Sequence, residues 1–142
     1  LKRELLWIPI FGWGLAMLKP IAINRSRKQQ ALKSLMLQAP QAIKKGFWYM
    51  VYPEGTRVDP NEHKNYSSGS SMIACKNGFD VLPIAHNAGY CWPARKFLKY
   101  PGEITLSIGP LISSKDKKAK NLTSEVEAWI RNEQKLIGSG LK

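Results

Sequence analysis

Four residues that follow an aromatic run carry side chains suited to binding a charged ligand. They are Glu54, Gly55, Thr56 and Arg57, which follow Pro53 without an apolar residue between them. A carboxylate, a hydroxyl and a guanidinium form strong hydrogen bonds, and glycine permits backbone angles that other residues avoid. In an ordinary Pro-x-Gly turn the same residues would only reverse the chain, with Arg57 solvated or paired with Glu54.

The residues before this tetrad predict a strand that positions it. The run Phe47–Tyr52 contains aromatic residues, Met and Val without polar alternation. This pattern favours a strand that is buried on both faces. Pro53 would end the strand because it has no amide hydrogen for a sheet ladder. The tetrad would then lie beyond the carboxyl end of a strand, where ligands bind in open α/β sheets.

The string VYPEGTR at Val51–Arg57 resembles the FPEGTR motif of the glycerolipid acyltransferases, the family that includes the 1-acylglycerol-3-phosphate (lysophosphatidic acid) acyltransferases. Other segments are similar to this family in the same order: Lys2–Trp13, PIAINR at Pro20–Arg25 and DVLPIAHNA at Asp80–Ala88. The resemblance extends to Ile137, over nearly the whole chain. It implies a glycerol-3-phosphate-acyltransferase-like fold and an O-acyltransferase activity.

The resemblance also implies five substrate-binding residues: Arg25, Glu54, Gly55, Thr56 and Arg57. The two arginines would hold the phosphate of lysophosphatidic acid between them. Glu54 and Thr56 would shape the pocket by hydrogen bonding, and Gly55 would admit backbone amides. Asn24 stands where the family usually has Asp, so it can form hydrogen bonds but has no charge. Without the resemblance, Arg25 would be interpreted as a solvated residue before a helix.

The family motif that supplies the catalytic base is absent from this sequence. In the family, a His followed five positions later by Asp takes the proton of the acceptor hydroxyl. Here His63 is followed at that spacing by Ser68, and His86 by Cys91. The resemblance therefore implies no catalytic residue in this chain, and we expect the His-x4-Asp motif upstream of Leu1. A lone His near a strand end, such as His86, is typical of a structural hydrogen bond.

The charge balance indicates an anionic partner. Lys and Arg number 22, against 10 Asp and Glu. Such an excess attracts nucleic acid, anionic lipid headgroups or phosphorylated metabolites. No helix-turn-helix, zinc-knuckle or RNP string is present, so we expect no nucleic acid partner. Cys75 and Cys91 lack CxxC spacing, which favours reduced thiols and no metal site. We expect no cofactor, with acyl-CoA or acyl carrier protein as the acyl donor.

The apolar pattern suits a membrane surface or a buried core better than a membrane span. No stretch reaches about 18 uninterrupted apolar residues, so no transmembrane span is indicated. Leu5–Ile23 contains prolines, glycines and Lys19, which suits an element on a membrane surface or in a core. Trp92–Gly102 interleaves cations with aromatic residues, a mixture typical of an anionic lipid interface. We expect a membrane-associated protein on the cytoplasmic face of the inner membrane.

Hydrophobic periodicity predicts an α/β fold. Helices are predicted at Trp13–Leu18, from Ser26 to an end or restart at Pro40 and a cap at Gly46, at Met72–Lys76, and at Asn121–Ile137 with a Ser124–Glu127 capping box. Further strands are predicted at Pro20–Arg25, Asp80–Ala88 and Glu103–Gly109. A helix between two strands indicates a βαβ unit. We therefore expect one domain, residues 1–142, with a mixed, largely parallel sheet flanked by helices and its N-terminal part missing.

The resemblance implies transfer of a fatty acyl group to the sn-2 hydroxyl of 1-acylglycerol-3-phosphate, which gives phosphatidic acid. Two alternatives stay open. The acceptor could be glycerol-3-phosphate or another lysophospholipid, because VYPEGTR does not separate these substrates. The chain could also be a non-catalytic module that binds membranes through basic and aromatic residues. That module predicts salt-sensitive binding to anionic vesicles whatever the lysolipid.

Overall fold

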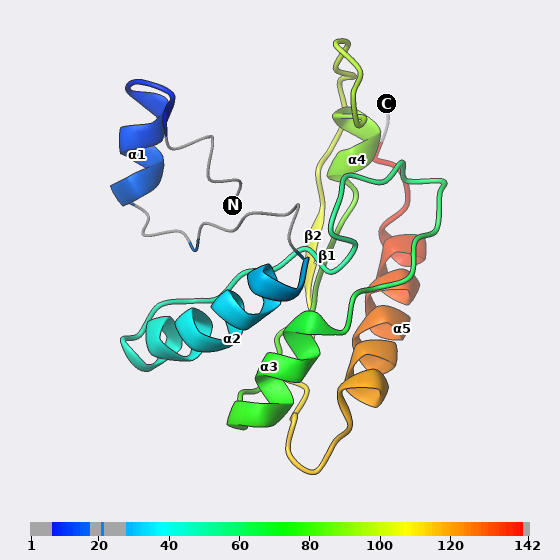
Figure 1. Ribbon diagram of the computed structural model, residues 1–142. Helices are drawn as coiled ribbons and strands as arrows, with labels where there is room; N and C mark the ends of the chain where they lie inside the picture. Colours follow the sequence, from blue (N-terminus) through cyan, green and yellow to red (C-terminus); the bar gives the residue numbers. More distant parts are fainter. Residues whose placement is uncertain (1–6, 18–20, 22–27, 141–142) are drawn as a thin grey trace. The chain divides into compact units, whose positions relative to one another are not determined.

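The structure, a computed structural model, describes residues 7–17, 21 and 28–140. It divides into two compact units, Leu1–Met50 and Val51–Lys142, which are described separately. The expectation of a single domain stays a prediction. In chain order the elements are α1 (Phe11–Met17), α2 (Lys28–Lys44), α3 (Gly69–Asn77), β1 (Ile84–His86), α4 (Ala88–Cys91), β2 (Leu106–Ile108) and α5 (Ala119–Ile137) (Figure 1). Within the described residues, no helix is long and apolar enough to cross a bilayer.

Two helices form the described part of the first unit. α1 confirms the helix predicted around Trp13. α2 continues through Pro40, so the predicted break there is wrong: the helix continues on both sides of a residue that cannot donate to the preceding turn. The predicted glycine cap is confirmed. Gly46 adopts a φ of 84°, and the amides of Gly46 and Phe47 donate back to carbonyls of the last turn at 2.9 and 3.1 Å.

The run Phe47–Tyr52 forms no strand, so that prediction is wrong. Trp48 is 86% exposed and Met50 is 72% exposed. High β propensity reflects how well a side chain packs on a sheet with hydrogen-bonded neighbours. None of the described segments pairs with this run. The tetrad that follows is therefore carried by a turn and not by the end of a strand.

An antiparallel ribbon lies in the second unit. β1 pairs with β2 in a register that places Ala85 opposite Ser107. A further bridge between Val81 and Ile112 extends the pairing, and both of its hydrogen bonds are 2.8–2.9 Å long. The strands predicted at Asp80–Ala88 and Glu103–Gly109 are thus present in shorter form. The described strands are antiparallel, which corrects the expected parallel pairing here, and a parallel sheet elsewhere stays a prediction.

The core of the second unit lies where α3 and α5 meet the ribbon. Ala74, Ile112 and Leu122 form a buried cluster, and Leu122 is fully buried. Beside it, the hydroxyl of Thr123 donates to that of Ser71 at 2.8 Å, which satisfies two buried polar groups between the helices. The helices predicted at Met72–Lys76 and Asn121–Ile137 are confirmed within α3 and α5. This core fixes α5 relative to α3 and the ribbon.

α5 packs tightly against the ribbon at Gly109. A Cβ atom at this position would lie 2.5 Å from Cζ2 of Trp129 and 2.9 Å from Cγ of Pro83. Distances below 3 Å are not found for real side chains, so the indole ring occupies the space that any other residue would need. The face of α5 that carries Trp129 therefore packs against Gly109 and Pro83 at one end of the ribbon.

Candidate functional site

The tetrad begins in a β-turn. The amide of Gly55 donates to the carbonyl of Tyr52 at 3.0 Å, with Pro53 in the second position of the turn. Gly55 has a φ of 70°, an angle that strains other residues. A Cβ atom at Gly55 would meet nothing within 4 Å. The glycine is therefore required by its backbone angle, and the expected close approach of backbone amides to a substrate stays a prediction.

The chain from the turn onward forms a closed loop, Pro53–Ser67, which we name the site loop. Its ends are joined by a hydrogen bond from the Ser67 amide to the Pro53 carbonyl at 2.9 Å. Inside it, Oδ1 of Asp59 accepts from the Asn61 amide at 3.2 Å, which stabilises a local turn. A compact loop with adjacent ends can present side chains in a fixed arrangement.

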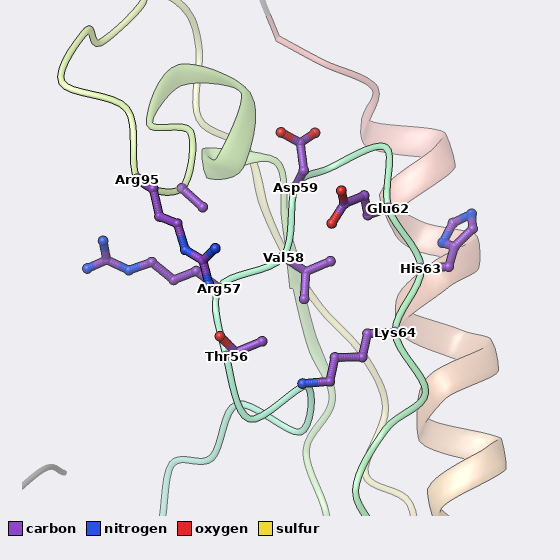
Figure 2. Close-up of a pocket in the computed structure, with 9 residues that line it drawn as sticks. Thr56, Arg57, Val58, Asp59, Glu62, His63, Lys64 and Arg95 are labelled. Carbon is purple, nitrogen blue, oxygen red and sulfur yellow. The ribbon is translucent and has the colours of Figure 1, made fainter.

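A cavity of about 450 Å³ lies between the site loop and the residues after α4 (Figure 2). Three cationic side chains line it, Arg57, Lys64 and Arg95, together with Thr56 and the carboxylates of Asp59 and Glu62. Figure 2 shows the side chain of Arg95 extending toward the segment that holds Thr56 and Arg57. Two guanidiniums and a hydroxyl at one cavity can bind the oxygens of a phosphate or carboxylate.

Arg131 of α5 holds the site loop in place. Its Nη1 lies 2.7 Å from Nδ1 of His63, and its Nη2 donates to the carbonyl of Lys64 at 3.0 Å. Its guanidinium also lies 5.5 Å from the centre of the Tyr66 ring. Because a guanidinium only donates, Nδ1 of His63 must be the acceptor in this pair. One side chain of α5 therefore makes contacts at three places along the loop.

Glu127 of α5 contacts both Arg131 and the site loop. Its carboxylate accepts from Arg131 one helical turn away and from the backbone amide of Tyr66 at 3.4 Å. The predicted capping box is wrong, because α5 begins at Ala119 and places Ser124 and Glu127 in the interior of the helix. The carboxylate of Glu127 orients Arg131 and does not cap the helix.

The carboxylate of Glu54 lies close enough to this network to interact with its charges. Burial raises the pKa of Glu54, and the positive charges of Arg131, His86 and Lys64 partly oppose that shift. Burial, followed by the nearby charge of Glu54, raises the pKa of Tyr66 to about 12. Both shifts favour the neutral form of the side chain.

The structure places the predicted site residues as follows. Thr56 and Arg57 line the cavity, whereas Glu54 is not among its described lining residues and lies near Arg131. Arg25 lies outside the described residues, so its pairing with Arg57 stays a prediction. Arg95 and Arg131 were not predicted as site residues. The loop position of Arg95 was assigned to a membrane surface, and nothing in the periodicity of α5 marks Arg131.

His86 makes a structural hydrogen bond. Its Nδ1 accepts from the amide of Ala88 at 3.3 Å, at the junction of β1 and α4. This is the kind of structural hydrogen bond that we expected for His86, and the role of His86 stays a prediction. Among the described residues, no group of three or more His, Cys, Asp or Glu side chains is placed to hold a metal ion.

Comparison with known proteins assigns the chain to a family. Residues 1–87 match the family model described as Acyltransferase, over the part of the sequence that includes VYPEGTR. The chain belongs to the acyltransferase family. This confirms the resemblance found in the sequence, and the family model ends at Asn87, where β1 gives way to α4.

Individual acyltransferases are similar over most of the chain. It is 46% identical over 133 residues to the 1-acyl-sn-glycerol-3-phosphate acyltransferase of Pseudomonas aeruginosa, which covers 92% of this chain and 52% of that protein. It is 24% identical over 127 residues to the enzyme of that name from Cocos nucifera, covering 89% of this chain and 41% of that protein. The chain therefore spans about half the length of the curated relatives it matches.

The fold is also that of a solved acyltransferase. The structure matches the crystal structure of the 1-acyl-sn-glycerophosphate (LPA) acyltransferase PlsC from Thermotoga maritima with a TM-score of 0.80 and 26% identity. The match covers 96% of this chain and 54% of that one. It confirms the expected acyltransferase fold and leaves the parallel sheet as a prediction.

Proposed function

We propose that the protein transfers a fatty acyl group from an acyl thioester to the sn-2 hydroxyl of 1-acylglycerol-3-phosphate, which yields phosphatidic acid. One observation carries this proposal. Thr56 and Arg57 of the acyltransferase motif line a cavity with Arg95, in a chain that is 46% identical to a 1-acyl-sn-glycerol-3-phosphate acyltransferase. The cavity chemistry suits the phosphate end of that acceptor.

The role of the cavity is to fix the phosphate of the acceptor. A guanidinium such as that of Arg57 can donate two parallel hydrogen bonds to phosphate oxygens, each contributing about 1.5–3 kcal/mol. Arg25 is proposed as the second guanidinium at this phosphate, and Thr56 as a neutral donor. Asp59 and Glu62 on the same cavity would repel a phosphate placed beside them, so the anion is expected at the Arg57–Arg95 side. A fixed phosphate presents one hydroxyl to the thioester.

The transfer itself needs a base, and this sequence has no His-x4-Asp motif. The acceptor oxygen attacks the thioester carbonyl, an ester bond forms, the carbon–sulfur bond breaks, and the proton passes from the hydroxyl through the base to the departing thiolate. We propose that the His of a His-x4-Asp motif outside this sequence is that base. The residues described here bind and orient the acceptor. Glu54 takes part indirectly, through its position beside Arg131 and Tyr66.

The proposed reaction places the protein at a membrane. Both the acceptor and the product are lipids, so we propose that it works on the cytoplasmic face of the inner membrane, with acyl-CoA or acyl carrier protein as donor. No cofactor or metal ion enters the proposed chemistry. The excess of Lys and Arg suits an anionic lipid surface.

Acceptor specificity tests the proposal. The full-length protein that contains this sequence would be assayed with acyl-CoA and four acceptors: lysophosphatidate, glycerol-3-phosphate, lysophosphatidylcholine and monoacylglycerol. Lysophosphatidate is expected to react fastest. Monoacylglycerol offers the same hydroxyl without the phosphate, and losing two charge-assisted bonds should lower kcat/KM about a hundredfold or more.

Other outcomes would contradict this assignment. Equal rates with monoacylglycerol would remove the phosphate-binding role of the cavity. Fastest transfer to glycerol-3-phosphate would change the acceptor but keep the reaction. Salt-sensitive vesicle binding without any acyl transfer would instead support the non-catalytic membrane-binding module.

A further inference from the structure

The segment Trp92–Tyr100, which we name the aromatic loop, projects beyond α4 in the second unit (Figure 1). Its base is closed by a hydrogen bond from the Tyr100 amide to the carbonyl of Cys91 at 2.9 Å. Its tip is held by Lys99, whose Nζ donates to the carbonyls of Lys96 and Phe97 at 2.8 and 3.1 Å. The loop is therefore a turn with defined internal contacts.

The tip of the aromatic loop presents large apolar side chains to solvent. Phe97 is 97% exposed and the adjacent Leu98 is 66% exposed. Trp92 and Tyr100 at the base are 64% and 44% exposed. A single exposed apolar residue is ordinary, but adjacent apolar side chains flanked by two exposed aromatic rings form a patch that water solvates poorly.

The charges on the loop identify the kind of surface that would cover this patch. Arg95, Lys96 and Lys99 lie within it, and no acidic residue occurs between Trp92 and Tyr100. The ammonium of Lys99 lies 4.9 Å from the centre of the Trp92 ring, so cation and aromatic ring share one side of the loop. Aromatic rings among Lys and Arg match the interface of an anionic bilayer, where rings lie at headgroup level and cations meet lipid phosphates.

We propose that the aromatic loop inserts its tip into the interface of an anionic phospholipid bilayer and so brings the cavity to the lipid headgroups. The proposal rests on the lipid acceptor of the proposed function. Ala94 and Arg95 of the loop line the cavity, and Arg95 is two residues from Phe97. Two residues span at most about 7 Å. An apolar side chain at a bilayer surface enters about 5–10 Å, so with Phe97 inserted, Arg95 lies at the depth of the lipid phosphates.

This position gives the loop a purpose in substrate capture. A lysolipid leaving the bilayer would meet Arg95 first and the Thr56–Arg57 segment next, since these residues line one cavity. Its phosphate would pass from the membrane surface into the cavity without crossing bulk water. The loop would therefore affect acceptors that reside in membranes and leave acceptors dissolved in water unaffected.

The first experiment measures binding of the full-length protein to vesicles. A double variant, Phe97→Ala with Leu98→Ala, removes the apolar tip without touching the cavity. The matched control is Leu111→Ala with Leu136→Ala, which removes two side chains that are 66% and 71% exposed elsewhere in the same unit. With mixed vesicles of phosphatidylcholine and phosphatidylglycerol, the tip variant should bind about tenfold more weakly or worse, and the control should bind as the wild type does.

An environment-sensitive fluorophore reports the insertion directly. The probe NBD would be attached at Phe97→Cys in a Cys75→Ala background, with Leu111→Cys as the control position. Anionic vesicles should shift the emission of the probe at position 97 to shorter wavelength and leave the control position unchanged. No shift at position 97, or an equal shift at both positions, would overturn the proposal. A shift caused by a soluble acidic acyl carrier protein and not by vesicles would also overturn it, in favour of a protein-docking surface.

Activity separates this proposal from the proposed function. The tip variant should lose about tenfold in kcat/KM for long-chain lysophosphatidate held in vesicles and keep the wild-type value for a short-chain, water-soluble lysophosphatidate. Equal losses on both acceptors would contradict the loop's role. If the wild type acylates neither acceptor, the proposed function fails, while the fluorescence result still decides whether the loop enters a bilayer.

Discussion

Replacing Arg131 with Met should loosen the site loop while leaving the fold of α5 in place. Arg131 makes two hydrogen bonds to the loop, to His63 Nδ1 at 2.7 Å and to the Lys64 carbonyl at 3.0 Å. Its side chain is 26% exposed, so we take about 1 kcal/mol for each bond, below the value for buried charge-assisted bonds. The loss of about 2 kcal/mol should raise the open population of the loop about thirtyfold. Met keeps the apolar stem beside Tyr66.

Hydrogen exchange and kinetics of the full-length protein measure this effect. Amide exchange of the peptide covering residues 57–67 should speed up by a similar factor, while exchange in the interior of α5 stays close to that of the wild type. KM for lysophosphatidate should rise about tenfold or more with little change in kcat, because Arg131 positions the binding loop and touches no reacting atom.

The control is Lys117→Met, which breaks the ion pair between Lys117 and Glu125 near the start of α5. The Nζ of Lys117 lies 2.6 Å from Oε2 of Glu125, and neither residue belongs to the site loop. Both variants should lower the free energy of unfolding by about 1 kcal/mol or less through the lost pair itself. If Arg131→Met and Lys117→Met gave the same exchange rates in residues 57–67 and the same KM, the positioning role of Arg131 would be refuted.

Three further predictions follow from the site. Arg57→Lys should lower kcat/KM for lysophosphatidate about tenfold or more, because an ammonium cannot donate two parallel hydrogen bonds to a phosphate; an unchanged value in steady-state assays would exclude a bidentate contact. Glu54→Gln should raise Tm at neutral pH, because burial raises the pKa of Glu54. As pH rises, the carboxyl ionises in the unfolded chain before it ionises in the folded one, so the wild type loses stability above the ordinary pKa range of Glu. The gain in Tm should therefore vanish in thermal scans at acidic pH. Tyr66→Phe should remove a loss of stability between pH 10 and 12, which are the ordinary pKa of tyrosine and the raised pKa of Tyr66. The full loss would be about 1.4 kcal/mol per pH unit, and partial exposure roughly halves it. Denaturant titrations in which both proteins lost stability equally with alkaline pH would contradict this prediction.

Four of the described helices, α1, α2, α3 and α5, and the turn could be predicted from the sequence because their signals are local. A glycine after the last helical residues was enough for the ends of α2 and α3, an apolar stripe was enough for α5, and a Pro-x-Gly string was enough for the turn at Gly55. The motif that begins in this turn also led to the family. Each of these features depends on residues within a few positions of one another.

The rest depends on contacts between distant residues. Phe47–Tyr52 has strong β propensity, but a strand exists only where a neighbour completes its ladder. Glu127 matches a capping box in sequence, yet its partners are Arg131 and Tyr66, and the second of these lies 61 residues away. Arg95 reaches the cavity only because the chain after α4 lies beside the site loop. No short window of the sequence contains both members of the contacts that Tyr66 and Arg95 make with distant residues.

The close contact at Gly109 has an evolutionary consequence. The indole of Trp129 fills the volume that a side chain at position 109 would need, so large side chains cannot occupy both positions at once. A lineage that acquired alanine at position 109 could keep α5 packed against the ribbon only by also acquiring a smaller residue at position 129. These two sites, 20 residues apart in the chain, should therefore change together among descendants of a common ancestor.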